Sequence, residues 1–131
     1  MARPASPHPT ELELVILKVL WRQAPRTVEE VRTELAANGR ELTYSSVITI
    51  MNIMVRKRLL KRTRRGRAFY FEPLVAERRV SGQMLSDLVD RVFDGSARAL
   101  MLRLLETSDV DDEELAAMRR MIQRIAREKK Q

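Results

Sequence analysis

The sequence predicts a mainly α-helical fold with a small β-hairpin, an α+β class: an N-terminal winged helix-turn-helix domain followed by a helical second domain. Three amphipathic helical patterns come first, then one strand–turn–strand pattern, then further amphipathic helices. We expect a flexible arm over residues 1–9, the winged-helix domain over 10–75 and the helical domain over 76–131.

Composition excludes several classes of protein. The 131 residues carry 25 Lys+Arg and 18 Asp+Glu, a net charge of +7, and 44% are hydrophobic, which is typical of a globular protein. The chain has no cysteine and a single histidine, His8. We therefore expect no disulfide, metal site, cofactor or enzymatic activity. No apolar segment resembles a secretory signal or a membrane span, so we expect a cytoplasmic protein.

Two capping-box patterns mark the first two helices. Thr10 precedes Glu13, and Thr27 precedes Glu30, at the spacing at which each side chain satisfies the other residue's backbone N–H. Apolar residues recur at helical spacing after each cap. Pro25 and Gly39 are expected to mark the two helix ends.

The third helix, predicted over residues 43–58, has two distinct faces. Apolar side chains at helical spacing are expected to pack inward: Val47, Ile50, Met51 and Met54. A second face is short and polar and ends in a cation: Ser45, Thr49, Asn52 and Arg56. Such a face suits the base edges and phosphates of DNA, or it is an ordinary solvent face. Ile48 and Ile53 flank it, either half-buried or with one touching a thymine methyl group.

Residues 60–73 change to a strand pattern around a tight turn at Arg65–Gly66, and Pro73 ends the second strand. The segment 56–67 carries eight cations and no acid: Arg56, Lys57, Arg58, Lys61, Arg62, Arg64, Arg65 and Arg67. Eight like charges repel one another unless a partner neutralises them, although a solvated face is the alternative. This hairpin is the predicted basic wing.

The charge surplus lies entirely in the first domain. Residues 1–75 hold 14 basic and 7 acidic side chains, whereas residues 76–131 hold 11 of each. A basic winged helix joined to a neutral helical domain predicts a DNA-binding protein with the third helix in the major groove and the wing on the backbone. The candidate DNA-binding residues are Thr43, Tyr44, Ser45, Ser46, Thr49, Asn52, Arg56, Arg62, Arg64, Arg65 and Arg67.

The second domain predicts a homodimer. It contains helical patterns over residues 76–92, after Ser96 and after Asp111, where Glu114 completes a third capping-box match. A domain this small seldom builds a sufficient core alone, so two copies are expected to share one. Packing back onto the first domain in a monomer is the alternative. The candidate dimerisation residues are Leu85, Leu88, Val92, Leu100, Leu104, Leu115, Met118, Ile122 and Ile125.

An ordered set of short motifs resembles a known family. These are Thr-Glu-Leu-Glu at 10–13, Leu-Trp at 20–21, Thr-Val-Glu-Glu-Val at 27–31, Tyr-Ser-Ser-Val at 44–47 with Thr49, Gly-Arg-Ala at 66–68 with Tyr70 and Pro73, and Phe-Asp-Gly-Ser at 93–96. Over residues 10 to about 125 the chain resembles the BlaI/MecI/CopY family of penicillinase-type repressors. The resemblance implies a dimeric winged-helix repressor that occupies a palindromic operator and blocks transcription.

The chain departs from that family at three places. The β-lactamase repressors are cut at an Asn-Phe bond, but residues 99–104 here are Ala-Leu-Met-Leu-Arg-Leu. A membrane metallopeptidase sensor encoded nearby would restore release by proteolysis. The cysteines with which the copper-responsive members bind metal are absent. Ile48 and Ile53 replace residues that are often polar or basic in the family, which leaves the operator sequence open.

Two other functions remain as alternatives. Seven methionines, several in the second domain, would suit a ligand-gated regulator with a small-molecule pocket in the dimer domain, although methionine is more often core filler. A winged helix that binds RNA or docks on a protein is the other alternative. The acidic run 111–114 is expected to cap a helix rather than hold a cation.

Overall fold

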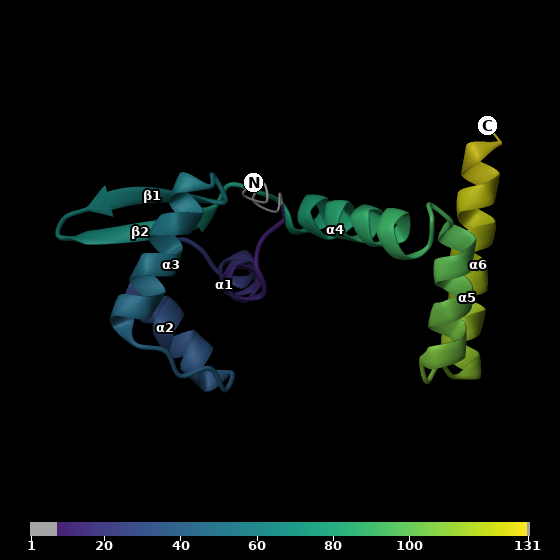
Figure 1. Cartoon of the computed structure of the whole chain (residues 1–131), viewed down its shortest axis with the longest axis horizontal. Helices are drawn as coiled ribbons and strands as arrows, with labels where there is room; N and C mark the ends of the chain where they lie inside the picture. The colour runs from purple at the N-terminus through teal and green to yellow at the C-terminus, as the bar shows by residue number, and fades with distance from the viewer. Residues whose placement is uncertain (1–7, 131) are drawn as a thin grey trace, which may run out of the picture. The chain divides into compact units, whose positions relative to one another are not determined.

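In a computed structural model, which describes residues 8–130, the chain divides into two compact units, the first up to Ser86 and the second from Asp87. The elements are α1 (Glu11–Arg22), α2 (Val28–Ala37), α3 (Tyr44–Arg56), β1 (Leu60–Arg65), β2 (Ala68–Pro73), α4 (Glu77–Val92), α5 (Ala97–Thr107) and α6 (Asp112–Lys129) (Figure 1). This order confirms the predicted mainly α fold with a small hairpin. Residues 1–7, most of the predicted arm, lie outside the described residues.

Two of the three predicted capping boxes are complete. Thr10 Oγ1 accepts from the Glu13 N–H at 3.2 Å, and the Thr10 N–H donates to Glu13 Oε1 at 2.9 Å. Thr27 and Glu30 exchange the same pair of bonds at the start of α2. The third match is half formed, since the Asp111 side chain accepts from the Glu114 N–H at 2.8 Å and acts as a simple N-cap.

The third helix is shorter than predicted at both ends. Thr43 is its N-cap, because its side chain accepts from the Ser46 N–H. At the other end Arg58 takes a φ of 63°, a left-handed value that stops the helix. The N–H groups of Arg58 and Leu59 donate to the carbonyls of Val55 and Met54, as in a Schellman motif. Glycine usually fills this position, as Gly39 does after α2, so an arginine there gave no stop signal.

The hairpin is antiparallel, with Leu60 opposite Pro73 and Arg65 opposite Ala68. Its turn is Gly66–Arg67, one residue later than the predicted Arg65–Gly66. Gly66 has a φ of 64°, and a glycine at the first central position is what a type II′ turn requires. The hairpin is anchored to the loop before α2 by paired backbone bonds between Arg26 and Phe71.

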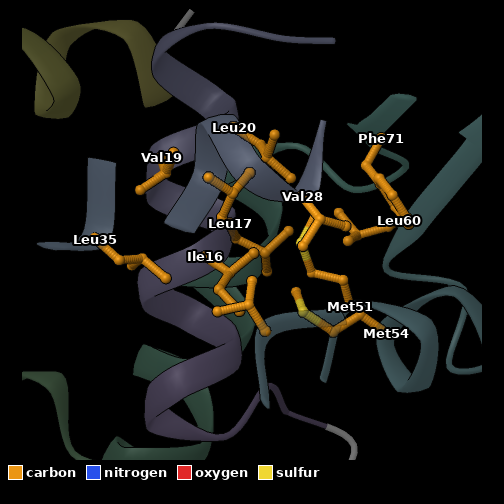
Figure 2. Packing of buried hydrophobic residues seen from close by; sticks show 12 residues of the cluster. Ile16, Leu17, Val19, Leu20, Val28, Leu35, Met51, Met54, Leu60 and Phe71 are labelled. Carbon is orange, nitrogen blue, oxygen red and sulfur yellow. The ribbon is translucent and has the colours of Figure 1, made fainter. Parts of the chain in front are cut away.

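The core of the first unit joins α1, α2, α3 and the base of the hairpin. Its buried members are Ile16, Leu17, Val19, Leu20, Val28, Val31, Leu35, Val47, Met51, Met54, Leu60 and Phe71. In Figure 2, Leu17 lies between the other α1 side chains and Met51 of α3. Leu17 is fully buried there. Trp21 is half-buried and donates from Nε1 to the Val75 carbonyl at 2.9 Å, which ties α1 to the chain after the hairpin.

The second unit contains the end of α4 together with α5 and α6. The predicted break after α4 is present, since Asp94 and Gly95 both have positive φ and Ser96 caps α5 through a bond from the Ala99 N–H. No described side chain from Asp87 to Lys130 is buried. Among the described residues, no helix is long and apolar enough to cross a membrane.

Candidate nucleic-acid interface

The start of α3 presents a cluster of small hydroxyl side chains at the surface. Thr43 Oγ1 donates to Ser46 Oγ at 2.9 Å while accepting from the Ser46 N–H. These two predicted DNA-binding residues therefore hold the helix start. Tyr44 and Ser45 are exposed beside them. A helix N-terminus with exposed hydroxyls suits a phosphate or a base edge.

The polar face of α3 lies opposite its buried face. Ser45, Thr49 and Arg56 are exposed and Asn52 is half-buried, whereas Val47, Met51 and Met54 are buried. Thr49 Oγ1 donates to the Ser45 carbonyl at 2.8 Å, so the hydroxyl proton is occupied and its oxygen remains available as an acceptor. Ile48 and Ile53 are half-buried, the first of the two placements that the sequence allowed for them.

The inner face of the hairpin connects the core to the wing tip. Side chains of paired residues share one face of a sheet, and Leu60 and Phe71 on this face are buried in the core. Farther out, Arg62 lies with its guanidinium carbon 4.8 Å from the centroid of the Phe69 ring. Arg62 Nη1 also donates to Asn52 Oδ1 at 2.9 Å. The hairpin is thereby joined to the polar face of α3.

The rest of the hairpin carries cations toward the turn. Arg64 Nε donates to the Gly66 carbonyl at 3.1 Å, and the Arg65 guanidinium carbon lies 5.4 Å from the Tyr70 ring centroid. Arg67 is exposed in the turn itself. An aromatic ring attracts a guanidinium group through its face but carries no negative charge, so the arginine keeps its full positive charge.

Two of the eight cations in residues 56–67 pair with acids. Lys57 Nζ lies 3.0 Å from Glu13 Oε1, and Lys61 Nζ lies 4.0 Å from Glu72 Oε1. The Glu13 side chain is only 4% exposed, whereas the second pair is solvated and weak. Within residues 8–130 the other six cations have no ion pair and remain exposed: Arg56, Arg58, Arg62, Arg64, Arg65 and Arg67.

The Glu13 carboxylate is ionised in spite of its burial. Burial has the largest single influence on its pKa and raises it, but the hydrogen bonds from the Thr10 N–H and the Lys57 ammonium, with the Lys57 charge, outweigh burial and lower the pKa overall. The sequence contained a signal that Glu13 needs a partner, although it did not identify Lys57. Glu13 lies at helical spacing with Ile16, Leu17 and Leu20, and a charge on a core-facing position requires a partner.

A hollow of about 430 Å³ lies beside the contact between Asn52 and Arg62. The start of α2, the polar face of α3 and the inner face of the hairpin line it, and Asn52, Arg62 and Phe69 are among the lining residues. The structure thus brings predicted residues of α3 and of the wing to one surface. The contact between Asn52 and Arg62 was not predicted, because it joins two elements with different periodicities.

The predicted dimerisation residues lie on exposed faces of α4, α5 and α6. Leu100 is half-buried, and the other eight are 38–60% exposed: Leu85, Leu88, Val92, Leu104, Leu115, Met118, Ile122 and Ile125. Leu85 belongs to the first unit and the others to the second. Met101 and Met121 are also exposed there. Within the described residues, no three His, Cys, Asp or Glu side chains are grouped as metal ligands.

Comparisons with known proteins cover most of the chain. A model of the penicillinase repressor family matches residues 9–124. The transcriptional regulator BlaI of Mycobacterium tuberculosis is 30% identical over 114 residues, which span 86% of this chain and 80% of that protein. The penicillinase repressor of Bacillus licheniformis is 23% identical over 127 residues, which span 95% and 97% of the two chains.

A solved structure also matches about half of the chain. It is the solution structure of the DNA-binding domain of the repressor BlaI, with 25% sequence identity and a TM-score of 0.48. The match covers 54% of this chain and 85% of that domain.

Proposed function

Because the chain belongs to the penicillinase repressor family, a family of transcriptional repressors and not of enzymes, we propose that this repressor binds a palindromic DNA operator as a homodimer. In this proposal α3 enters the major groove and the hairpin follows the phosphate backbone. The observation that carries it is that Asn52, on the polar face of α3, lines one hollow together with Arg62 and Arg67, two exposed hairpin cations that have no ion pair among the described residues.

The two parts of this surface suit different parts of DNA. The exposed arginines at the hairpin tip have no acidic partner among the described residues, so their charge is available to DNA phosphates, which are the same in every sequence. The hydroxyls and the amide on α3 are short side chains fixed by helix geometry, which suits base edges. Affinity would therefore come mainly from the hairpin, and sequence preference from α3.

The second unit supports the homodimer. It spans residues 87–131, and its amphipathic helices leave large apolar side chains about half exposed. An apolar surface of this kind on a soluble protein usually meets a partner. A second copy would cover it with the same residues through a two-fold axis. The same axis would place two α3 helices on two half-sites, one duplex turn of about 34–36 Å apart or a multiple of it.

Helix α5 does not favour proteolytic release through a metallopeptidase sensor. The stretch that corresponds to the cleaved bond lies at residues 99–104, inside α5, and contains no Asn-Phe pair. A protease would have to unwind this helix before it could bind an extended substrate.

The test is a salt series on an operator selected from a pool of randomised duplexes. Each phosphate contact that releases a counterion adds about −0.9 to the slope of log K against log salt. A dimer that uses several of the six cations per copy should give a steep slope. A slope near zero, or failure to select any duplex, would refute the proposal.

Four single variants separate the two roles. Arg65→Ala and Arg67→Ala should weaken binding to specific and random duplexes alike. Because each variant removes one phosphate contact from both copies of the homodimer, each should reduce the salt slope by about 2. Thr49→Ala and Asn52→Ala should change the preference among operators instead. Equal losses on specific and random DNA for all four variants would contradict the division of roles.

A further inference from the structure

Arg62 is attached to α3 rather than extended into solvent. Its Nη1 donates to Asn52 Oδ1 at 2.9 Å, and its guanidinium carbon lies 4.8 Å from the centroid of the Phe69 ring. A guanidinium group contains only donors, so the Asn52 atom that faces it must be the carbonyl oxygen. The contact therefore fixes the orientation of the Asn52 amide.

Strand register explains why Arg62 reaches α3. Arg62 lies opposite Phe71 in the strand register and on the same sheet face as Leu60. Phe71 and Leu60 are both buried in the core. Phe69 is the diagonal neighbour of Arg62 on that face, a position at which long and aromatic side chains touch. The side chain is thus held from one side by the ring and from the other by the amide.

We propose that Arg62 sets the base preference of α3 by occupying the carbonyl oxygen of Asn52; this rests on the proposed function of α3 as the helix that contacts bases. A free asparagine pairs with adenine through both halves of its amide, since the oxygen accepts from N6 and the nitrogen donates to N7. With its oxygen engaged by Arg62, Asn52 offers mainly its two N–H donors. Guanine presents two acceptors, N7 and O6, on the same edge.

Charge favours the same base. The Asn52 oxygen has a second lone pair, but any further donor to it meets the field of the adjacent guanidinium cation. The amino hydrogens of adenine are partly positive and are repelled there. The O6 atom of guanine is partly negative and is attracted, so hydrogen-bond matching and electrostatics both favour guanine over adenine.

The pair is accessible to a base edge. Asn52 and Arg62 both line the hollow of about 430 Å³ between α2, α3 and the hairpin, and Asn52 is only half-buried. Arg62 is then a positioning residue that acts through Asn52. Its role differs from that of Arg65 and Arg67, which are proposed to contact phosphates.

The test compares the sequences that variants select from a pool of randomised duplexes. The position at which Asn52→Ala loses its preference is the one that Asn52 contacts, and the wild type should prefer guanine there. Arg62→Met keeps an apolar stem beside Phe69 but removes every donor. It should shift the preference at that position toward adenine, with the guanine-to-adenine ratio falling at least about fivefold.

Arg64→Met is the matched control. Arg64 lies on the same strand and its guanidinium carbon is 6.0 Å from the same ring, but its Nε donates to the Gly66 carbonyl instead of Asn52. It should lower affinity for all duplexes without changing the preferred base, and circular dichroism of both variants should match the wild type.

Two results would overturn the inference while leaving the proposed function intact. One is a uniform loss in Arg62→Met that equals the loss in Arg64→Met, with the preferred base unchanged. The other is a wild type that already prefers adenine at the position that Asn52 contacts. A wild type that selects no duplex would refute the proposed function, and this inference with it.

Discussion

The two units of the chain use the same apolar residue types but bury them very differently. In the first unit, twelve apolar side chains from three helices and a hairpin form one core. In the second, no described side chain between Asp87 and Lys130 is buried, although α5 and α6 are amphipathic, as α1 is. An amphipathic pattern shows that a helix face needs cover, but it does not show whether the cover comes from the same chain.

Chain length accounts for the difference. The first unit folds three helices around the base of a hairpin, so each apolar face meets another element. The second unit has two complete helices and part of a third, which are too few to enclose a core. Its stability should therefore depend on protein concentration, whereas that of the first unit should not.

The largest expected effect is a difference in stability between two variants, each of which truncates one leucine, one in each unit. Leu17→Ala removes a side chain that is 0% exposed and should lower the free energy of unfolding by about 2–5 kcal/mol at any protein concentration. Leu104→Ala alters a side chain that is 50% exposed and should cost stability only at concentrations at which the proposed dimer forms. Urea unfolding at two concentrations measures both. If Leu104→Ala lowers the free energy of unfolding equally at both protein concentrations, the second unit has a core within one chain.

A somewhat smaller effect concerns association itself. Ile122→Glu places a charge on the exposed apolar face of α6 and should weaken the proposed dimer by at least about 2 kcal/mol, roughly thirtyfold in the dissociation constant. Sedimentation equilibrium measures the change. Gln123→Glu adds the same charge on the neighbouring exposed residue and is the control. If the two variants dissociate equally, net charge rather than the apolar face controls association.

Local rules predicted most of the first unit from the sequence. The caps at Thr10 and Thr27, the apolar spacing in α3 and the glycine of the turn each depend on residues within a few positions of one another. The errors also have local causes. Arg58 adopts a left-handed φ that usually marks a glycine, so the end of α3 had no sequence signal. The turn moved by one residue, because Gly66 fits either central position of a two-residue loop.

Contacts between distant residues were not predictable in the same way. Glu13 and Lys57 are 44 positions apart, and Asn52 and Arg62 lie on a helix and a strand with different periods. Each contact depends on how the hairpin and α1 pack against α3, which no single pattern encodes. The candidate interface was therefore predicted as a set of residues, whereas the internal bonds that limit what each one can offer to DNA came only from the structure.

The smallest effect tests the partly buried ion pair between Glu13 and Lys57. The exposed capping box of Thr27 and Glu30 supplies the control. Glu13→Gln keeps a side chain that can complete the capping box but leaves Lys57 without its carboxylate, so it should cost about 1–2 kcal/mol at neutral pH. Glu30→Gln makes the same change in an exposed capping box, and no ion pair with Glu30 is present among the described residues, so it should cost less than about 0.5 kcal/mol.

Acid titration of unfolding gives this last prediction its sign. The pKa of Glu13 is lower in the folded chain than its usual value of 4.5, so protonation favours the unfolded state. Its contribution is present above pH 4.5 and is lost as the pH falls through the folded pKa. The stability of the wild type should therefore fall toward that of Glu13→Gln as the solution is acidified, and the two curves should converge. Curves that stay parallel from neutral pH into acid would mean that Glu13 is held by packing and not by its charge.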